Sequence, residues 1–206
     1  MKKILFVTSE AHPLIKTGGL ADVCGSLPKA LAELSQDIRL IIPNYQSLKT
    51  TENVRFLSSI RVDNRNINLL ETRMPDSHVI VWLVDYPAYY NYPGNPYVDE
   101  EGEPWPNNAE RFGLFCRIVT EVAMNRINQD WAPDIVHCND WQTGLTPAYM
   151  KLVDGSNVKS IFSIHNLAFQ GCFDASWVAK LELPADHFNI NGFEYFEQLS
   201  FLKAGL

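Results

Sequence analysis

The sequence predicts an α/β fold in which an open, mostly parallel sheet carries helices on both faces. Continuous apolar runs rich in β-branched residues, such as "ILFV" (4–7), "IRLIIP" (38–43) and "HVIVWLVD" (78–85), are typical of parallel strands buried on both sides. Segments with helical spacing of apolar residues occur between strands of this kind. Because strands and helices alternate along the chain, helices are expected to cover both faces of the sheet.

The first helix is predicted to begin at Leu20, after the strand at 4–7. Its apolar residues recur at helical spacing and are expected to form the stripe that faces the sheet: Val23, Leu27, Leu31 and Leu34. Pro28 interrupts this pattern, so it is expected to kink the helix or to begin a second helical piece.

A hairpin and a long loop are predicted in the middle of the chain. Residues 54–62 and 67–74 read as strands around "DNRN", which is a hairpin signal, and the strand at 78–85 follows them. Residues 86–108 are rich in Pro, Gly and Tyr and predict a loop. A structureless loop of this length in a compact domain is usually functional or mobile.

Alternating helices and strands are predicted for the rest of the chain. The expected elements are a helix at 109–127, a strand and its exit at 134–140, a helix at 141–153, a strand and its exit at 158–166, and helices near 175–181 and 194–204. The last residues, "SFLKAGL", stand inside a helix-like pattern without a stop signal, which suggests that the chain has been cut from a longer one.

Length and composition indicate one domain, residues 1–206, with a formal net charge of −7. This charge disfavours nucleic acids and anionic membranes as partners, because both select basic surfaces. The four scattered cysteines predict reduced thiols in a cytoplasmic protein. Neither a metal site nor a membrane-spanning run is expected, because histidines lack ligand spacing and no apolar run is long enough.

Polar residues follow several of the predicted strands, where α/β sheets bind their ligands. In "KTGGLAD", Gly18 and Gly19 are expected to leave backbone amides uncovered at the start of a helix, and Lys16 adds a mobile positive charge. Together these features suit a phosphate. A tight turn beside a solvated lysine is the equally weighted alternative.

Asp140 and Trp141 follow the strand that begins at residue 134. The carboxylate can accept hydrogen bonds from sugar hydroxyls and the ring can pack on a sugar face, but Asp140 is also a good candidate for a helix N-cap. His165 and Asn166 end the next strand, and His165 is expected to point toward Lys16 and Asp140. A hydrogen-bonded structural role is the equally weighted alternative for this histidine.

Other residues near these segments favour structural roles. His137 lies inside a strand and is expected to belong to the core. Tyr90, Tyr92 and Tyr97 could form a wall against a sugar, although a loop packed on itself is favoured for most of them. Cys138 and Cys172 are expected to be small buried residues.

Several motifs resemble bacterial glycogen synthases and plant starch synthases. The N-terminal signature is "SEAHPLIKTGGLADVCGSLPKAL", and it is followed in the family's order by "YNYPGNPY", "DIVHCNDWQTGLTPAYM", "SIFSIHNLAFQGCF" and "FEQLSFLKAGL". The resemblance implies the N-terminal, acceptor-side Rossmann-like half of a two-domain GT-B glycosyltransferase. This enzyme would transfer glucose from ADP-glucose to the non-reducing end of an α-1,4-glucan with retention of configuration.

The resemblance also implies roles for residues at matching positions. Lys16 would bind the sugar nucleotide, and Asp140 and His165 would be the catalytic pair at the glucose. The remaining implied contacts are Gly18 and Gly19 beside the phosphates, and Tyr97 and Asn166 near the donor sugar or acceptor. No cofactor is implied besides the donor substrate, and the partner would be a C-terminal nucleotide-binding domain absent from these residues.

Two positions depart from the family's pattern: Gln142 replaces a common histidine, and Asn91-Tyr92 replaces a common Asp-Arg. The motifs fit a non-catalytic glucan- or nucleotide-binding module equally well if the natural chain is this short. An NAD-dependent dehydrogenase is disfavoured, because the sequence lacks the G-x-G-x-x-G fingerprint.

Overall fold

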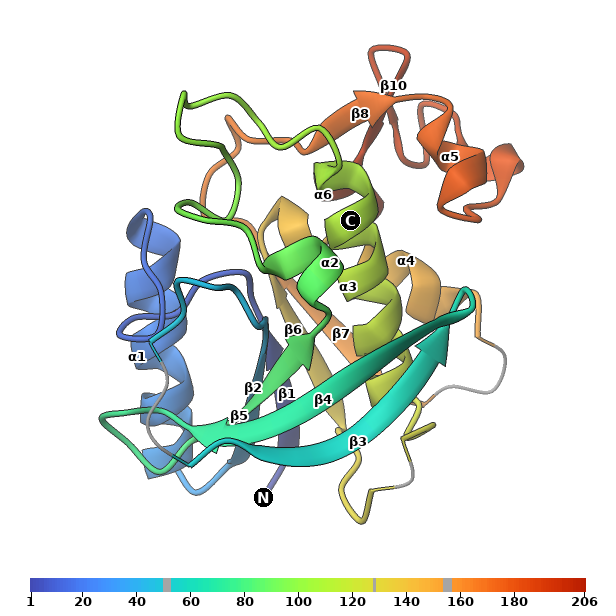
Figure 1. The fold of residues 1–206 in the computed structure, drawn as a ribbon. Helices are drawn as coiled ribbons and strands as arrows, with labels where there is room; N and C mark the ends of the chain where they lie inside the picture. Colours follow the sequence, from blue (N-terminus) through green and yellow to red (C-terminus); the bar gives the residue numbers. More distant parts are fainter. Residues whose placement is uncertain (50–52, 128, 154–156) are drawn as a thin grey trace.

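The computed structural model describes residues 1–49, 53–127, 129–153 and 157–206 (Figure 1). Its main sheet has seven strands in the order β3-β4-β5-β2-β1-β6-β7. Five strands are parallel: β1 (Lys3–Val7), β2 (Asp37–Pro43), β5 (Ile80–Asp85), β6 (Ile135–Asn139) and β7 (Lys159–Ser163). The hairpin of β3 (Arg55–Val62) and β4 (Arg65–Arg73) adds two antiparallel strands at one edge. The predicted mostly parallel sheet is confirmed.

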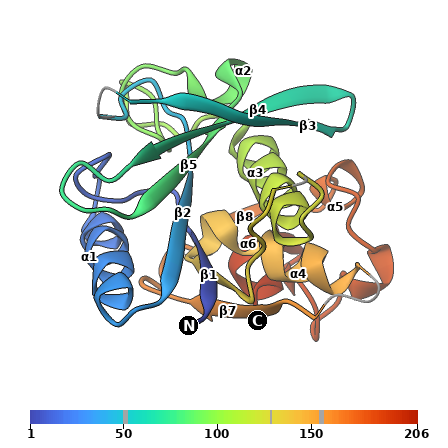
Figure 2. The same ribbon diagram turned by 90° about the horizontal axis from the view of Figure 1, so that it is seen from below.

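Helices cover both faces of this sheet. Figure 2 shows α1 (Gly19–Glu33) on one side and α3 (Asn108–Ala123) with α4 (Leu145–Lys151) on the other. Thirteen of the sixteen residues of α3 are buried, because this helix packs on the sheet and also on the C-terminal segment. A short 3-10 turn, η1 (Trp141–Thr143), precedes α4, so the predicted helix 141–153 is divided.

The buried face of α1 agrees only partly with the predicted stripe. The helix continues through Pro28, so no second piece begins there. Leu27 and Leu31 are partly buried and pack on the main core, whereas Val23 and Leu34 are 38% and 70% exposed. The fully buried residues of the helix are Leu20, Ala21, Cys24, Gly25 and Pro28. Small residues face inward because the loop before the helix lies against it: a Cβ on Gly25 would stand 2.1 Å from the carbonyl oxygen of His12.

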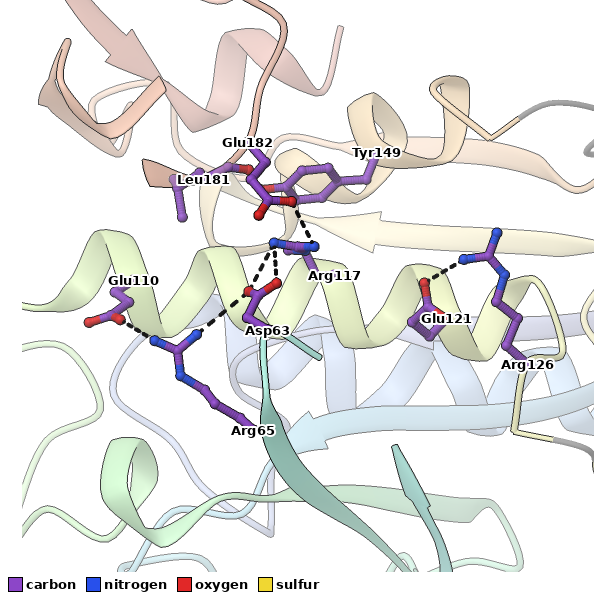
Figure 3. Close-up of polar contacts among 9 residues, drawn as sticks. All are labelled: Asp63, Arg65, Glu110, Arg117, Glu121, Arg126, Tyr149, Leu181 and Glu182. Atoms are coloured by element: carbon purple, nitrogen blue, oxygen red, sulfur yellow. Dashed lines mark hydrogen bonds and ion pairs between the residues drawn. The ribbon is translucent and has the colours of Figure 1, made fainter. Parts of the chain in front are cut away.

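The hairpin tip is tied to α3 by ion pairs (Figure 3). Asp63 and Asn64 form the tip with φ angles of 49° and 62°, the left-handed geometry of two-residue hairpin turns. Arg117 of α3 lies 2.8 Å from Asp63 and 3.1 Å from Glu182, and Arg65 lies 2.7 Å from Glu110. The tip therefore contacts α3 and, through Arg117, the segment after α5 (Trp177–Lys180).

The predicted loop at 86–108 contains a short helix, α2 (Pro87–Tyr90), and is held in place by a side chain of α3. The anchor is Arg111, which is fully buried. It donates to the carbonyl oxygens of Tyr89 at 2.6 Å and Pro96 at 3.0 Å, and to Asn108 Oδ1 at 2.7 Å. Burial lowers the pKa of Arg111 from its ordinary value. Because residues 87–90 form α2, the expectation of a structureless segment was wrong for them.

The C-terminal segment forms a small second sheet, which the sequence analysis missed. Its strands are β8 (Cys172–Asp174), β9 (Glu194–Tyr195) and β10 (Gln198–Ser200), in the order β8-β10-β9. The expected helix at 194–204 was wrong except for α6 (Phe201–Ala204). Another 3-10 turn, η2 (Ala185–His187), lies between α5 and β9. This segment packs on α3 and α4 around a second cluster of apolar side chains, which includes Phe112, Leu145, Leu199 and Phe201.

Candidate active site

The loops that follow β1, β6 and β7 begin at the carboxyl-end edge of the sheet, where its parallel strands end. The parallel register pairs Val7 with Cys138 and Asn139 with Ser163, so these strands end side by side. Residues 8–19, 140–141 and 164–166 therefore leave the sheet at neighbouring points. This is the edge at which open α/β sheets bind ligands.

Lys16 is exposed and ion-paired at this edge. Its Nζ lies 2.6 Å from Oδ1 and 2.8 Å from Oδ2 of Asp22, in the first turn of α1. The lysine and aspartate side chains are 47% and 57% exposed, so an anion from solvent can reach the ammonium. A Cβ built on Gly18 or Gly19 would meet nothing within 4 Å, and the space in front of both glycines is open.

The backbone amide of Gly18 is not free, contrary to the expectation from the sequence. Gly18 N donates to Oε2 of Glu10 at 3.2 Å, and Thr17 N donates to the same oxygen at 2.5 Å. The chain bends at Thr17 and Gly18 with Gly18 extended at φ −148°, and Lys16 is exposed but paired with Asp22, so the alternative of a turn beside an exposed lysine agrees in part. The loop before α1 is thus held from inside the protein by a carboxylate.

The carboxylate that holds this loop belongs to Glu10, which was not identified from the sequence. Glu10 is buried, with 2% of its surface exposed. The second oxygen, Oε1, accepts from the hydroxyl of Tyr97 at 2.7 Å. The same hydroxyl lies 2.7 Å from Ser9 Oγ. One buried side chain therefore joins the loop at Gly18 to the predicted site residue Tyr97.

Asp140 holds the other part of the site in a similar way. It is 7% exposed, and its Oδ1 accepts from the backbone N–H of His165 at 2.7 Å and of Asn166 at 3.4 Å. Asp140 occupies the N-cap position of η1, as one interpretation expected, but its side chain makes no capping bond there. Thr143 N donates instead to the main-chain oxygen of Asp140, which has a φ of 58°.

The ring of His165 is oriented by Asn139, which is fully buried. Asn139 Nδ2 donates to the carbonyl oxygens of Val7 at 3.1 Å and His137 at 3.2 Å. These two acceptors fix the amide, so its Oδ1 is the atom that lies 3.0 Å from His165 Nε2. Nε2 therefore carries the proton, and in the neutral ring Nδ1 is left as an acceptor.

Burial and the two carboxylates shape the electrostatics around these groups. Burial raises the pKa of the Cys24 thiol to about 12, and the negative charges of Asp140 and Glu10 both add to the rise. The Tyr97 hydroxyl is held well above its ordinary pKa by burial and then by Glu10. Both groups therefore stay protonated at neutral pH. The pKa of His137 is lowered by burial and by the nearby His165.

The remaining predicted candidates have structural contacts. Trp141 lies in the second apolar cluster, 5.1 Å from Phe112 between ring centroids. Asn166 Oδ1 accepts from Ala168 N at 2.9 Å. The expectation that the tyrosine loop packs on itself is confirmed for Tyr92, whose hydroxyl donates to the carbonyl oxygen of Ala88. Tyr90 is fully buried and its hydroxyl donates instead to the carbonyl oxygen of Arg111 in α3.

Several other expectations concern burial and bonding. Cys138 is buried as expected, whereas Cys172 is only partly buried; all four thiols are free. Gln142 is 5% exposed, and its Oε1 has no partner among the described residues. This side chain belongs to the interior and not to the open edge.

The described contacts assemble the predicted residues into two groups. Asp140, His165 and Asn166 form one group, and Gly18 is joined to Tyr97 through Glu10 in the other. Within the described ranges, Lys16 has polar contact with Asp22 alone. A cavity of about 540 Å³ lies beside Lys16, between residues 12–17 and 94–96, with Ser47 and Lys49.

The described parts of the chain contain no group of three or more His, Cys, Asp or Glu side chains placed to hold a metal ion. None of their helices combines the length and the apolar character needed to cross a membrane.

Comparison with known proteins gives a consistent set of relatives. The family model described as the starch synthase catalytic domain matches residues 3–206. A glycogen synthase of Cellvibrio japonicus is 45% identical over 100% of this chain and 43% of its own length. Glycogen synthase 2 of Nitrosococcus oceani is 46% identical over 100% of this chain and 42% of its own length. The chain thus spans less than half the length of the curated relatives it matches.

Among solved structures, the catalytic domain of starch synthase IV from Arabidopsis thaliana, bound to ADP and acarbose, has the same fold. It superposes with a TM-score of 0.81 at 22% identity, covering 99% of this chain and 43% of that one. This similarity extends to the whole arrangement of sheet and helices described above.

Proposed function

The chain belongs to the family of starch synthase catalytic domains, and from this membership we propose that it is the N-terminal, acceptor-side domain of a glycogen synthase. The proposed reaction is transfer of glucose from ADP-glucose to the non-reducing end of an α-1,4-glucan, with retention of configuration. The named relatives are glycogen synthases, and the solved neighbour is a starch synthase domain bound to ADP and acarbose. Both observations support a nucleotide-sugar donor and a glucan acceptor.

The observation that carries this proposal is the Asp140–His165 arrangement at the strand ends. Oδ1 of Asp140 accepts two backbone amides, while Oδ2 has no protein partner among the described residues. His165 is exposed, and Asn139 leaves its Nδ1 as an acceptor. Two acceptors are therefore held by fixed backbone at neighbouring strand ends, which suits the hydroxyls of one sugar ring.

Lys16 is proposed to bind the phosphates of the donor. A diphosphate would replace Asp22 as the partner of its ammonium group. Because the Lys16–Asp22 pair is exposed, losing it costs only about 0–1 kcal/mol. Gly19 is proposed to let a phosphate approach the start of α1, since the space in front of it is open.

The nucleotide is proposed to bind mainly to a second domain. The relatives have more than half of their length outside the part matched here. Asn166 and Tyr97 would then lie near the donor sugar or the acceptor, between the two domains.

Retention of configuration is proposed to occur on one face of the sugar. Two backbone amides hold Oδ1 of Asp140 and so fix the orientation of its carboxylate at the strand end. We therefore assign it a positioning and electrostatic role, while the leaving phosphate takes the proton of the incoming hydroxyl on the same face. Catalysis would rest on orientation and on charge stabilisation.

The test compares Asp140→Asn and His165→Ala in the full-length protein, with ADP-glucose or UDP-glucose and glycogen. We expect turnover to fall about 10²-fold or more, as for other groups aimed at a reacting centre, while Tm changes little. Asp186→Asn and His187→Ala are matched controls at exposed positions. If the lower activity is accompanied by a large drop in Tm, Asp140 and His165 stabilise the fold and their role in catalysis is not supported. A wild-type protein that binds glucan or nucleotide but transfers no glucose from either donor would be a binding module.

A further inference from the structure

Glu10 is a buried carboxylate that no cation neutralises within the described residues. It is 2% exposed, and its three hydrogen-bond donors are Thr17 N, Gly18 N and the Tyr97 hydroxyl. Burying a charge is costly unless hydrogen bonds compensate it. These three donors therefore supply the compensation, and they come from two segments about 80 residues apart in the chain.

We propose that Glu10 is a positioning residue, which holds the loop around Lys16 and the side chain of Tyr97 at a fixed separation so that they act as one unit. This inference rests on the proposed function, because it assigns the loop to the donor and Tyr97 to the sugar or acceptor. Glu10 does not touch the substrate. Both of its oxygens are occupied inside the protein.

The direction of the hydrogen bonds defines how the unit is built. Tyr97 stays protonated and donates to Glu10 Oε1, so the contact with Ser9 must be a bond that Ser9 Oγ donates to the tyrosine oxygen. The resulting chain runs from Ser9 through Tyr97 to Glu10 and then to the loop amides. Removing the Tyr97 hydroxyl leaves the buried Oε1 of Glu10 without its donor, which is destabilising.

The cavity beside Lys16 shows what this separation controls. One of its walls is formed by residues 12–17 and another by residues 94–96. Glu10 holds the first wall through Thr17 N and the second through Tyr97, which directly follows Pro96. The width of the cavity is therefore set by the carboxylate between the two walls.

The experiment uses amide hydrogen exchange and donor kinetics of the full-length protein. In Glu10→Ala, exchange at Thr17 and Gly18 is expected to rise about 10- to 100-fold, because charge-assisted hydrogen bonds are lost, and KM for ADP-glucose is expected to rise by a similar factor. Glu10→Gln should restore most of both. Its oxygen can accept from the amides, and its NH₂ can donate to Tyr97.

A second pair of variants tests the link between Tyr97 and the loop amides even if Glu10→Ala does not fold. Tyr97→Phe removes one oxygen at constant shape and is expected to speed exchange at Thr17 and Gly18. Tyr92→Phe is the matched control from the same loop, because its hydroxyl contacts Ala88 and Asn107. It should leave exchange at both amides unchanged.

The outcomes separate this inference from the proposed function. Unchanged exchange at Thr17 and Gly18 in Tyr97→Phe, or equal effects of the two phenylalanine variants, would overturn the role of Glu10. Faster exchange in Tyr97→Phe but not in Tyr92→Phe supports it. Faster exchange without any change in donor KM would support the link from Glu10 to the loop and to Tyr97. It would contradict the proposal that the loop binds the donor.

Discussion

Lys16 shows how a single residue at the open edge can be tested. Its ammonium group is exposed and held by Asp22 at 2.6 Å. We expect Lys16→Ala in the full-length protein to weaken binding of ADP-glucose by about 1.5–3 kcal/mol, the range for hydrogen bonds to charged groups. Lys16→Gln should lose nearly as much, because the stem remains and the charge does not. Donor KM and direct titration with ADP measure the effect.

Asp22→Asn is the matched control for this prediction. It removes the competing carboxylate and leaves Lys16 charged, so donor affinity should stay the same or rise slightly. If neither Lys16 variant changes donor affinity, the lysine has no role in binding phosphate, and the exposed ion pair with Asp22 is its whole function.

Candidate residues could be selected from the sequence, whereas the side chains that support them could not. Lys16, Asp140 and His165 stand in recognisable motifs in the segments that follow β1, β6 and β7. Glu10 also follows a strand, but its partners lie 7, 8 and 87 residues away. A side chain that bonds to distant backbone leaves no local pattern, and Asn139 was missed for the same reason.

At the scale of elements, the contact between α1 and the preceding loop is very close. A Cβ on Gly25 would stand 2.1 Å from the carbonyl oxygen of His12, so Gly25→Ala must move the helix or the loop. We expect a loss of about 1–3 kcal/mol in the free energy of unfolding, as for other overpacked sites. Urea denaturation measures the loss.

Gly19→Ala is the control in the same helix. A Cβ there meets nothing within 4 Å, and alanine favours helix over glycine by up to about 1 kcal/mol, so stability should be unchanged or higher. A loss at Gly19 equal to that at Gly25 would mean that backbone freedom, and not close packing, explains both glycines.

The hairpin tip offers a second test at this scale (Figure 3). Asp63 and Arg117 are 28% and 24% exposed, and each has a second ion-pair partner, Arg65 for Asp63 and Glu182 for Arg117, so their pair should contribute more than a solvated one. A double-mutant cycle with Asp63→Asn and Arg117→Gln is expected to give a coupling of about 1 kcal/mol. The pair Glu121–Arg126, with Arg126 52% exposed, should give about 0.5 kcal/mol or less. Equal couplings would contradict a special role for the tip.

Elements were predictable where one period dominates the sequence. The buried strands and the hairpin were found because continuous apolar runs and "DNRN" are strong local signals. The stripe of α1 was correct for Leu27 and Leu31 but wrong for Val23 and Leu34, because only large side chains were counted and small ones face the loop. The helix expected at 194–204 was wrong because Phe196 and Glu197 form the turn, with φ angles of 48° and 62°, and neither is a typical turn residue.

At the scale of the whole molecule, α3 connects two apolar clusters. Leu114 and Phe115 belong to the cluster on the main sheet, and Phe112 and Cys116 to the one under the small sheet. The small sheet and the main sheet are therefore supported by one helix. Residues 1–206 thus contain enough continuous core to be expected to fold together.

The last prediction concerns these 206 residues on their own: they should unfold cooperatively but transfer no glucose. Folding follows from the shared core around α3. The lack of activity follows from the proposed site, which offers a diphosphate one exposed lysine already paired with Asp22 and the start of one helix. On a face open to water these charges are screened, and the part of the relatives that this chain does not span would supply the opposing contacts. Without them, transition-state stabilisation falls further than donor binding. The measurement is ADP release from ADP-glucose with glycogen, beside a thermal unfolding curve. Steady release above a boiled control would show that these residues form a complete catalyst and would end the two-domain proposal.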